Sequence, residues 1–208
     1  MNSFSLLLFC VTVLPLIFTP GPDILYITTR GIAQGRRAAM ISTVGVCTGY
    51  VAHTVMAVAG LTAILYASEL LFNAVRYAGA AYLLYLGIKT LRSNTQFKVD
   101  GAHEAHSARS LFLTGMLTSV MNPKGILLFF AYLPQFVSPE AGSVPLQLLI
   151  VGTMFTLMCG IVYGIYALFS SAIGHRLSNS PRFADALRWL TASVFMGLGL
   201  RLLFSERL

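Results

Sequence analysis

Thr19-Pro20-Gly21-Pro22-Asp23 interrupts an apolar stretch that runs from Phe4 to about Ile27. Each proline removes a backbone donor and clashes with the preceding helical turn, so a straight helix cannot continue through these residues. A carboxylate follows the break directly. Within a bilayer, irregular backbone and charge are tolerated where protein buries them or where they line a cavity. The stretch therefore predicts a broken membrane helix, with Asp23 in the first turn of its second half.

The composition indicates an all-α integral membrane protein. The chain has 208 residues, of which 56% are hydrophobic and 10% are charged, whereas about a quarter of a soluble domain is charged. The net charge of +7 fits basic cytoplasmic loops better than a nucleic-acid partner. The three cysteines are isolated, and no CxxC or His/Cys cluster occurs. We therefore expect neither a metal site, nor a disulfide framework, nor a cofactor.

Six stretches are long and apolar enough to cross a bilayer, which takes about 20 residues. They cover about 5–28, 39–66, 75–91, 111–133, 145–171 and 187–204. Loops one, three and five, with their flanks, hold ten of the fourteen Lys and Arg residues, which places these loops in the cytoplasm and both termini outside. No basic residue precedes Arg30, so the first stretch is predicted to be a retained span rather than a signal peptide.

The polar segment 93–110 divides one transporter domain, 1–208, into repeats at about 1–92 and 111–208. Pro22-Asp23 and Pro123-Lys124 lie 101 residues apart, in the first span of each repeat. Three spans per repeat is an odd number, so the second repeat is predicted to be inverted. Inverted repeats with interrupted helices in matching positions are typical of secondary transporters. His103 and His106 lie in the linker, where a solvated segment is favoured over a metal site because no further ligands are suitably spaced.

Asp23 and Lys124 are the charged candidates for a substrate site. A first-turn acid stabilises a helix, but a cation after Asn122-Pro123 opposes the helix dipole and needs a partner. An Asp23–Lys124 ion pair joining the repeats would supply one. Alternatively, Asp23 holds the ammonium of an amino acid, while Lys124 and the restarted helices bind its carboxylate. Asp23 is also a candidate for the proton-coupling group. The residues alone leave these roles open.

The remaining candidates surround the two breaks or share their spans. Gly21, Pro22, Pro123 and Asn122 shape the breaks, and Gln135 ends the fourth span. His53, in the second span, is a candidate proton relay, although one interhelical hydrogen bond is the commoner role. Two GxxxG patterns, at 45–49 and 160–164, favour close helix packing. Tyr77, Tyr82 and Tyr85 are expected to pack or to line a cavity.

Two stretches resemble the signatures of the LysE/RhtB family of amino acid exporters. Pro20-Gly21-Pro22-Asp23, followed by Arg30-Gly31 and Gly35-Arg36-Arg37-Ala38, resembles the first signature, although Ala39 stands where glycine is frequent. Asn122-Pro123-Lys124, followed by Phe129-Phe130 and Leu133-Pro134-Gln135-Phe136, resembles the second.

The resemblance implies proton-driven amino acid efflux across the bacterial inner membrane and carries Asp23, Asn122 and Lys124 over as functional positions. The Pro-Asp form resembles the homoserine/threonine/leucine-type branch, so we expect a neutral substrate. The sequence leaves open whether the chain forms a homo-oligomer.

Other classes of function fit the sequence less well. A membrane thiol oxidoreductase needs paired cysteines, and Cys10, Cys47 and Cys159 do not sit at the breaks. We therefore expect no enzymatic activity. A metal-ion or other small-solute exporter of related topology is the alternative. A metal exporter would need several carboxylates within the spans, however, and Lys124 would repel a cation.

Overall fold

A computed structural model of the chain describes residues 3–61, 69–92, 106–170 and 181–204, and every regular element in these ranges is helical. The elements are α1 (Ser3–Phe18), α2 (Pro22–Gln34), α3 (Arg36–Met56), η1 (Ala57–Leu61), α5 (Glu69–Arg92), α6 (Ala108–Val120), α7 (Pro123–Leu127), η2 (Leu128–Tyr132), η3 (Leu133–Phe136), η4 (Pro139–Ala141), α8 (Val144–Leu168) and α10 (Pro181–Phe204). The predicted all-α class is confirmed. The linker residues 93–105 lie outside the described ranges.

The first predicted break is confirmed, because α1 and α2 meet at a bend of 52°. Pro22 is the first residue of α2, where its missing N–H is not needed. The helix then continues to Gln34, past the predicted span end near residue 28, because no helix breaker intervenes. Arg30 is thus helical instead of lying in the first loop. The chain turns at Gly35, whose φ of 83° suits glycine.

The second predicted break is confirmed in α6 and α7, which form a bend of 49°. Asn122 is the N-cap of α7, and Pro123 is its first residue. The helix α7 has only five residues, and the chain then continues through the π-helix η2 and the 3-10 helix η3. Such departures from regular helix often accompany functional sites.

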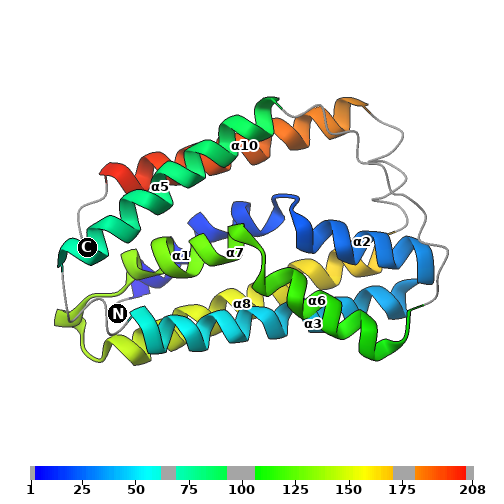
Figure 1. The fold of residues 1–208 in the computed structure, drawn as a ribbon, viewed down its shortest axis with the longest axis horizontal. Coiled ribbons are helices and arrows are strands. Elements are labelled where there is room, and N and C mark those ends of the chain that lie inside the picture. The colour runs from blue at the N-terminus through cyan, green and yellow to red at the C-terminus, as the bar shows by residue number, and fades with distance from the viewer. Residues whose placement is uncertain (1–2, 62–68, 93–105, 171–180, 205–208) are drawn as a thin grey trace.

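Glycines bring α3 close to its neighbours in the helix body, which comprises α1, α2, α3, α6, α7 and α8 (Figure 1). A Cβ on Gly45 would lie 2.2 Å from the Phe112 carbonyl oxygen, and one on Gly49 would lie 2.6 Å from Ser119 Cβ. The GxxxG pattern at 45–49 therefore packs tightly onto α6, as predicted. The pattern at 160–164 makes no such close helix contact, since a Cβ on Gly164 would meet nothing within 4 Å.

The helices α5 and α10 lie side by side along one edge of the helix body (Figure 1). Their contact is close, because a Cβ on Gly199 would lie 2.9 Å from Leu84 Cγ. Arg201 of α10 joins the pair to the body by donating to the Tyr132 hydroxyl at 2.9 Å.

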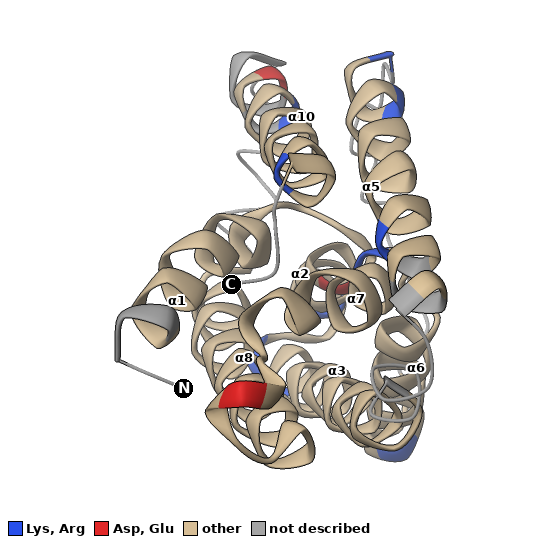
Figure 2. Ribbon diagram, turned by 90° about the vertical axis from the view of Figure 1, so that its left-hand side faces the viewer, with Lys and Arg blue, Asp and Glu red and all other residues tan. Residues whose placement is uncertain are grey.

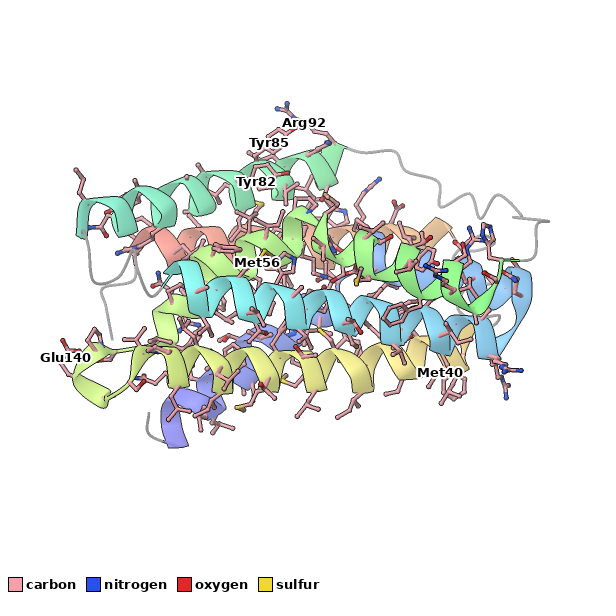
Figure 3. The ribbon with its side chains drawn as sticks, turned by 60° about the horizontal axis from the view of Figure 1, so that its bottom comes forward. Met40, Met56, Tyr82, Tyr85, Arg92 and Glu140 are labelled. Carbon is pink, nitrogen blue, oxygen red and sulfur yellow. The ribbon has the colours of Figure 1, made fainter. Side chains whose placement is uncertain are left out.

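Tyr77, Tyr82 and Tyr85, which were expected to pack or to line a cavity, are partly exposed on α5. Their exposed fractions are 50%, 37% and 52%, and Tyr82 and Tyr85 lie next to each other on α5 (Figure 3). The tyrosine spacing places these rings on a face of α5 that no described helix covers.

In the described residues, four of the six predicted spans are helical and long and apolar enough to cross a membrane. Arg36–Gly60 and Val144–Leu168 meet these criteria alone, and the pairs α1 with α2 and α6 with α7 to η3 meet them as bent units. Each of α5 and α10 has 24 residues, which is long enough to cross a bilayer. Met40, near the start of α3, and Glu140, in η4, mark opposite ends of the molecule (Figure 3).

Candidate functional site

The two breaks meet inside the helix body, where Figure 2 shows an acidic segment enclosed between α2 and α7. Asp23 of α2 is 1% exposed, and Lys124 of α7 is 6% exposed. Asn122, at the N-cap of α7, is equally buried. The sequence therefore correctly grouped these three side chains, although Asp23 is 99 residues from Asn122 in the chain.

Asp23 uses one of its carboxylate oxygens and leaves the other unpaired. Oδ2 accepts hydrogen bonds from the Tyr50 hydroxyl at 2.5 Å and from Asn122 Nδ2 at 2.8 Å. Oδ1 is buried and has no hydrogen-bond partner in the protein. A buried polar atom without a partner costs free energy unless a ligand, a proton or water satisfies it.

Lys124 finds its partner in the backbone of the first break. Its Nζ donates to the Thr19 carbonyl oxygen at 2.9 Å, just beyond the end of α1, where unpaired carbonyls and the helix dipole favour a cation. No direct ion pair forms between Lys124 and Asp23, so that interpretation was wrong. An ammonium carries three donors, and Thr19 accepts only one of them.

Asn122 connects the two breaks with the two ends of its amide. Its Oδ1 accepts from the Lys124 backbone N–H at 3.0 Å and caps α7. Its Nδ2 donates to Asp23.

The first break has no equivalent cap, because Gly21 carries no side chain and α2 has no side-chain cap hydrogen bond. Pro22 has no N–H, and the Leu25 N–H bonds to the Gly21 carbonyl oxygen at 3.0 Å. The N–H groups of Asp23 and Ile24 are therefore the first-turn donors of α2 that no helical carbonyl satisfies.

The other predicted site residues play smaller parts in this geometry. Pro22 and Pro123 are exposed first residues of their helices. Gly21 lies beside Lys124, since a Cβ built on it would be 3.7 Å from Lys124 Cδ. Gln135 is buried in η3 with its Nε2 unpaired and has no hydrogen bond to Asp23, Asn122 or Lys124.

His53 makes the single interhelical hydrogen bond that is the common role of such a residue. Its Nε2 lies 3.2 Å from the Ser119 carbonyl oxygen. A carbonyl can only accept, so Nε2 carries the hydrogen. The ring also stacks on Phe129, with centroids 5.3 Å apart. Its Nδ1 is buried without a partner, and the histidine does not contact Asp23 through a hydrogen bond.

The sequence reasoning missed Tyr50 and Tyr163. The Tyr50 hydroxyl bonds to Asp23, and the Tyr163 hydroxyl lies 3.4 Å from that of Tyr50. Tyr50 could have been found from its spacing, because it precedes His53 by three residues and therefore shares a face of α3 with it. Tyr163 gave no comparable signal.

Comparison with known proteins identifies the family of this chain. The model of the family described as LysE type translocator matches residues 14–206. This chain belongs to the LysE type translocator family. It is therefore a multi-pass membrane transporter rather than an enzyme, and the family resemblance seen in the sequence is confirmed.

Several relatives extend over nearly all of this LysE-type chain. A leucine efflux protein of Enterobacter sp. (strain 638) is 31% identical over 190 residues, covering 90% of this chain and 89% of the relative. The uncharacterized membrane protein YrhP of Bacillus subtilis (strain 168) is 25% identical over 206 residues, covering 95% and 97%. A leucine efflux protein of Salmonella typhimurium is 27% identical over 188 residues, covering 90% and 89%. No solved structure matches the chain.

Proposed function

We propose that this LysE-type translocator exports neutral amino acids from the bacterial cytoplasm in exchange for protons. The observation that carries the proposal is the unused bonding capacity of Asp23 and Lys124. Asp23 Oδ1 is buried without a partner, and Lys124 Nζ bonds to one acceptor, Thr19. An amino acid carries one ammonium and one carboxylate, which match this buried acid and this buried base.

In this proposal the substrate bridges the two breaks. Its ammonium binds Asp23 Oδ1, and its carboxylate binds Lys124 Nζ and the open N–H groups at the start of α2. Charge-assisted hydrogen bonds of this kind are roughly twice as strong as neutral ones. The helix dipole of α2 also favours an anion at its first turn.

Exchange with protons follows from the chemistry of a single carboxylate. A protonated Asp23 is neutral and loses its attraction for an ammonium, so a proton and a substrate exclude each other at Oδ1. Each passage across the membrane then carries one or the other, which is antiport. His53 has no hydrogen bond to this carboxylate, and we assign it a packing role at the α3–α6 contact.

The surroundings of the breaks favour a neutral side chain. Tyr50 stacks on Phe129, and Phe155 packs against both rings. Among the described residues, Asp23 is the buried acid of this region, so a basic side chain would lack a second carboxylate. The relatives named leucine efflux protein support the same substrate class.

We also propose the architecture that the sequence predicts, namely one transporter domain in the bacterial inner membrane. It has six spans, repeats at about 1–92 and 111–208, and both termini outside. The nearly equal bends of 52° and 49°, each followed by a proline and a charged residue, support inverted repeats. The exchange of a metal ion has less support, because Lys124 shares the site.

Transport into proteoliposomes tests the proposed function. The full chain is reconstituted, a pH gradient is imposed, and the uptake of labelled L-leucine, L-threonine, L-homoserine and L-lysine is compared with and without the gradient. We expect gradient-dependent exchange of at least one neutral amino acid and none of L-lysine. Asp23→Asn should abolish it, while Asp185→Asn, at an exposed carboxylate that pairs with Arg188, should not. Gradient-independent uptake, or uptake unaffected by Asp23→Asn, would contradict the proposal.

A further inference from the structure

The hydrogen bonds of Asp23 are unequally shared between its two oxygens. Both donors, Tyr50 and Asn122, reach Oδ2, and none reaches Oδ1. A carboxylate free to rotate about its side-chain bonds would exchange the two oxygens. Two donors on one oxygen oppose that rotation, because turning the group would break both charge-assisted hydrogen bonds.

Tyr50 is the more firmly held of the two donors. Its side chain is fully buried. Its ring stacks on Phe129 at an interplanar angle of 17° and meets Phe155 edge to face at 4.9 Å. The hydroxyl also lies 3.4 Å from that of Tyr163. A phenol with neighbours on these sides has little freedom to follow a moving carboxylate.

The helix that carries Tyr50 is fixed as well. The close approach of Gly45 and Gly49 to α6 sets the distance between α3 and the helix that precedes Asn122. Tyr50 therefore lies on a helix packed tightly against α6, and Asn122 follows α6 after one residue, whereas Asp23 belongs to α2.

We propose that Tyr50 is the positioning residue of the exchange site, because its phenol holds Asp23 Oδ2 and thereby directs Oδ1 toward the ligand. The inference rests on the proposed function in that Oδ1 is the atom that binds the substrate ammonium or the proton. Tyr50 itself touches neither the ammonium nor the proton. It acts by keeping one oxygen occupied and the other available.

A purely structural role for Tyr50 makes a different prediction. Tyr50→Phe keeps the ring and its contacts with Phe129 and Phe155, and removes only the hydroxyl. If the ring alone mattered, this variant would behave like the wild type. If the hydroxyl positions Asp23, the variant changes the vibration of the carboxyl group and the affinity for substrate. Tyr26→Phe is a matched control, because it removes a hydroxyl that donates to the Leu111 carbonyl at 2.9 Å.

Infrared difference spectroscopy on the purified full chain in lipid, between acidic and basic buffer, reads the carboxyl group without any substrate. The band that disappears in Asp23→Asn is assigned to Asp23. We expect Tyr50→Phe to shift this band and Tyr26→Phe to leave it in place. In proteoliposomes, Tyr50→Phe should raise the KM for L-leucine by about tenfold, the effect of losing one hydrogen bond to a charged group.

The outcomes separate the two proposals. An unshifted Asp23 band in Tyr50→Phe, or a shifted band with an unchanged KM, overturns the role of Tyr50 and leaves amino acid export standing. Failure of the wild-type protein to exchange L-leucine or any other neutral amino acid overturns the proposed function itself. A shifted band together with a raised KM supports both.

Discussion

The two helix breaks share a shape and differ in chemistry. They bend by 52° and 49°, and each resumes with a proline followed by a charged residue. The first, at Gly21, has no side-chain cap and is followed by a regular helix of 13 residues. At the second break, the Asn122 side chain caps α7, and the chain leaves α-helical geometry after five residues. A similar interruption thus leaves an uncapped helix start beside an acid in the first half of the chain and a capped helix start beside a base in the second half.

The comparison explains where Lys124 belongs. Beside its own helix start the cation is unfavourable. Its ammonium instead reaches the Thr19 carbonyl at the end of α1. Both charges therefore lie at the first break, the acid at the start of α2 and the base at the end of α1.

Exchanging the two charges should have the largest effect. If the breaks were equivalent, Asp23→Lys combined with Lys124→Asp would keep an acid and a base at the site. We expect the double variant to lose export by at least about a hundredfold, because a lysine at position 23 would oppose the dipole at the start of α2. The exchange would also remove the hydrogen bonds to Asp23 and the bond from Lys124 to Thr19. Gradient-driven L-leucine exchange in proteoliposomes measures this. Substantial export by the exchanged protein would show that the breaks are interchangeable.

Removing the base should separate function from stability. Lys124→Met keeps the length of the side chain and removes its charge. The substitution removes the cost of burying an ammonium but leaves the Thr19 carbonyl without its side-chain donor. Because these two effects on stability oppose each other, the melting temperature should change little. Export should fall by about tenfold or more, since the substrate carboxylate loses a charged donor. Lys89→Met is the control, because the Lys89 ammonium lies over the exposed ring of Tyr85. A variant that loses both stability and export would indicate a structural lysine.

The two tasks of Asn122 can be tested separately. Asn122→Ala removes the cap and the donor to Asp23, and loss of a cap costs about 1 kcal/mol. Asn122→Ser restores a good cap, but its side chain is too short to reach Asp23. We expect serine to recover most of the thermal stability that alanine loses while export stays low in both variants. Recovery of export by serine would argue against the bond from Asn122 to Asp23.

Gly21→Ala should have the smallest effect. The φ of Gly21 is −155°, which any residue adopts, and the added methyl would make ordinary contact with Lys124 at 3.7 Å. We expect a change of less than about 0.5 kcal/mol in unfolding free energy, as is usual for substitutions without strain or cavity. By contrast, Gly45→Ala should destabilise by about 1–3 kcal/mol, because its methyl would overlap the Phe112 carbonyl. Equal effects of the two alanines on the melting temperature would contradict the packing described here.

The sequence predicted what backbone chemistry dictates. Prolines at 20, 22 and 123 require interrupted helices, and their positions made the grouping of Asp23, Asn122 and Lys124 predictable. The hydrogen bonds were less accessible. Opposite charges suggested an ion pair, whereas Lys124 binds a backbone carbonyl whose availability depends on where α1 ends. Tyr50 was missed because an aromatic residue in an apolar span has no distinctive pattern until its neighbours are known.

The amide of Asn122 has a consequence for the evolution and engineering of such transporters. Its oxygen serves the second half of the chain, and its nitrogen serves an acid in the first. Chimaeras that combine residues 1–92 of one relative with 111–208 of another should therefore work only when both parents carry the matching acid and amide. The two motifs therefore form one functional unit, although they lie in separate halves of the chain.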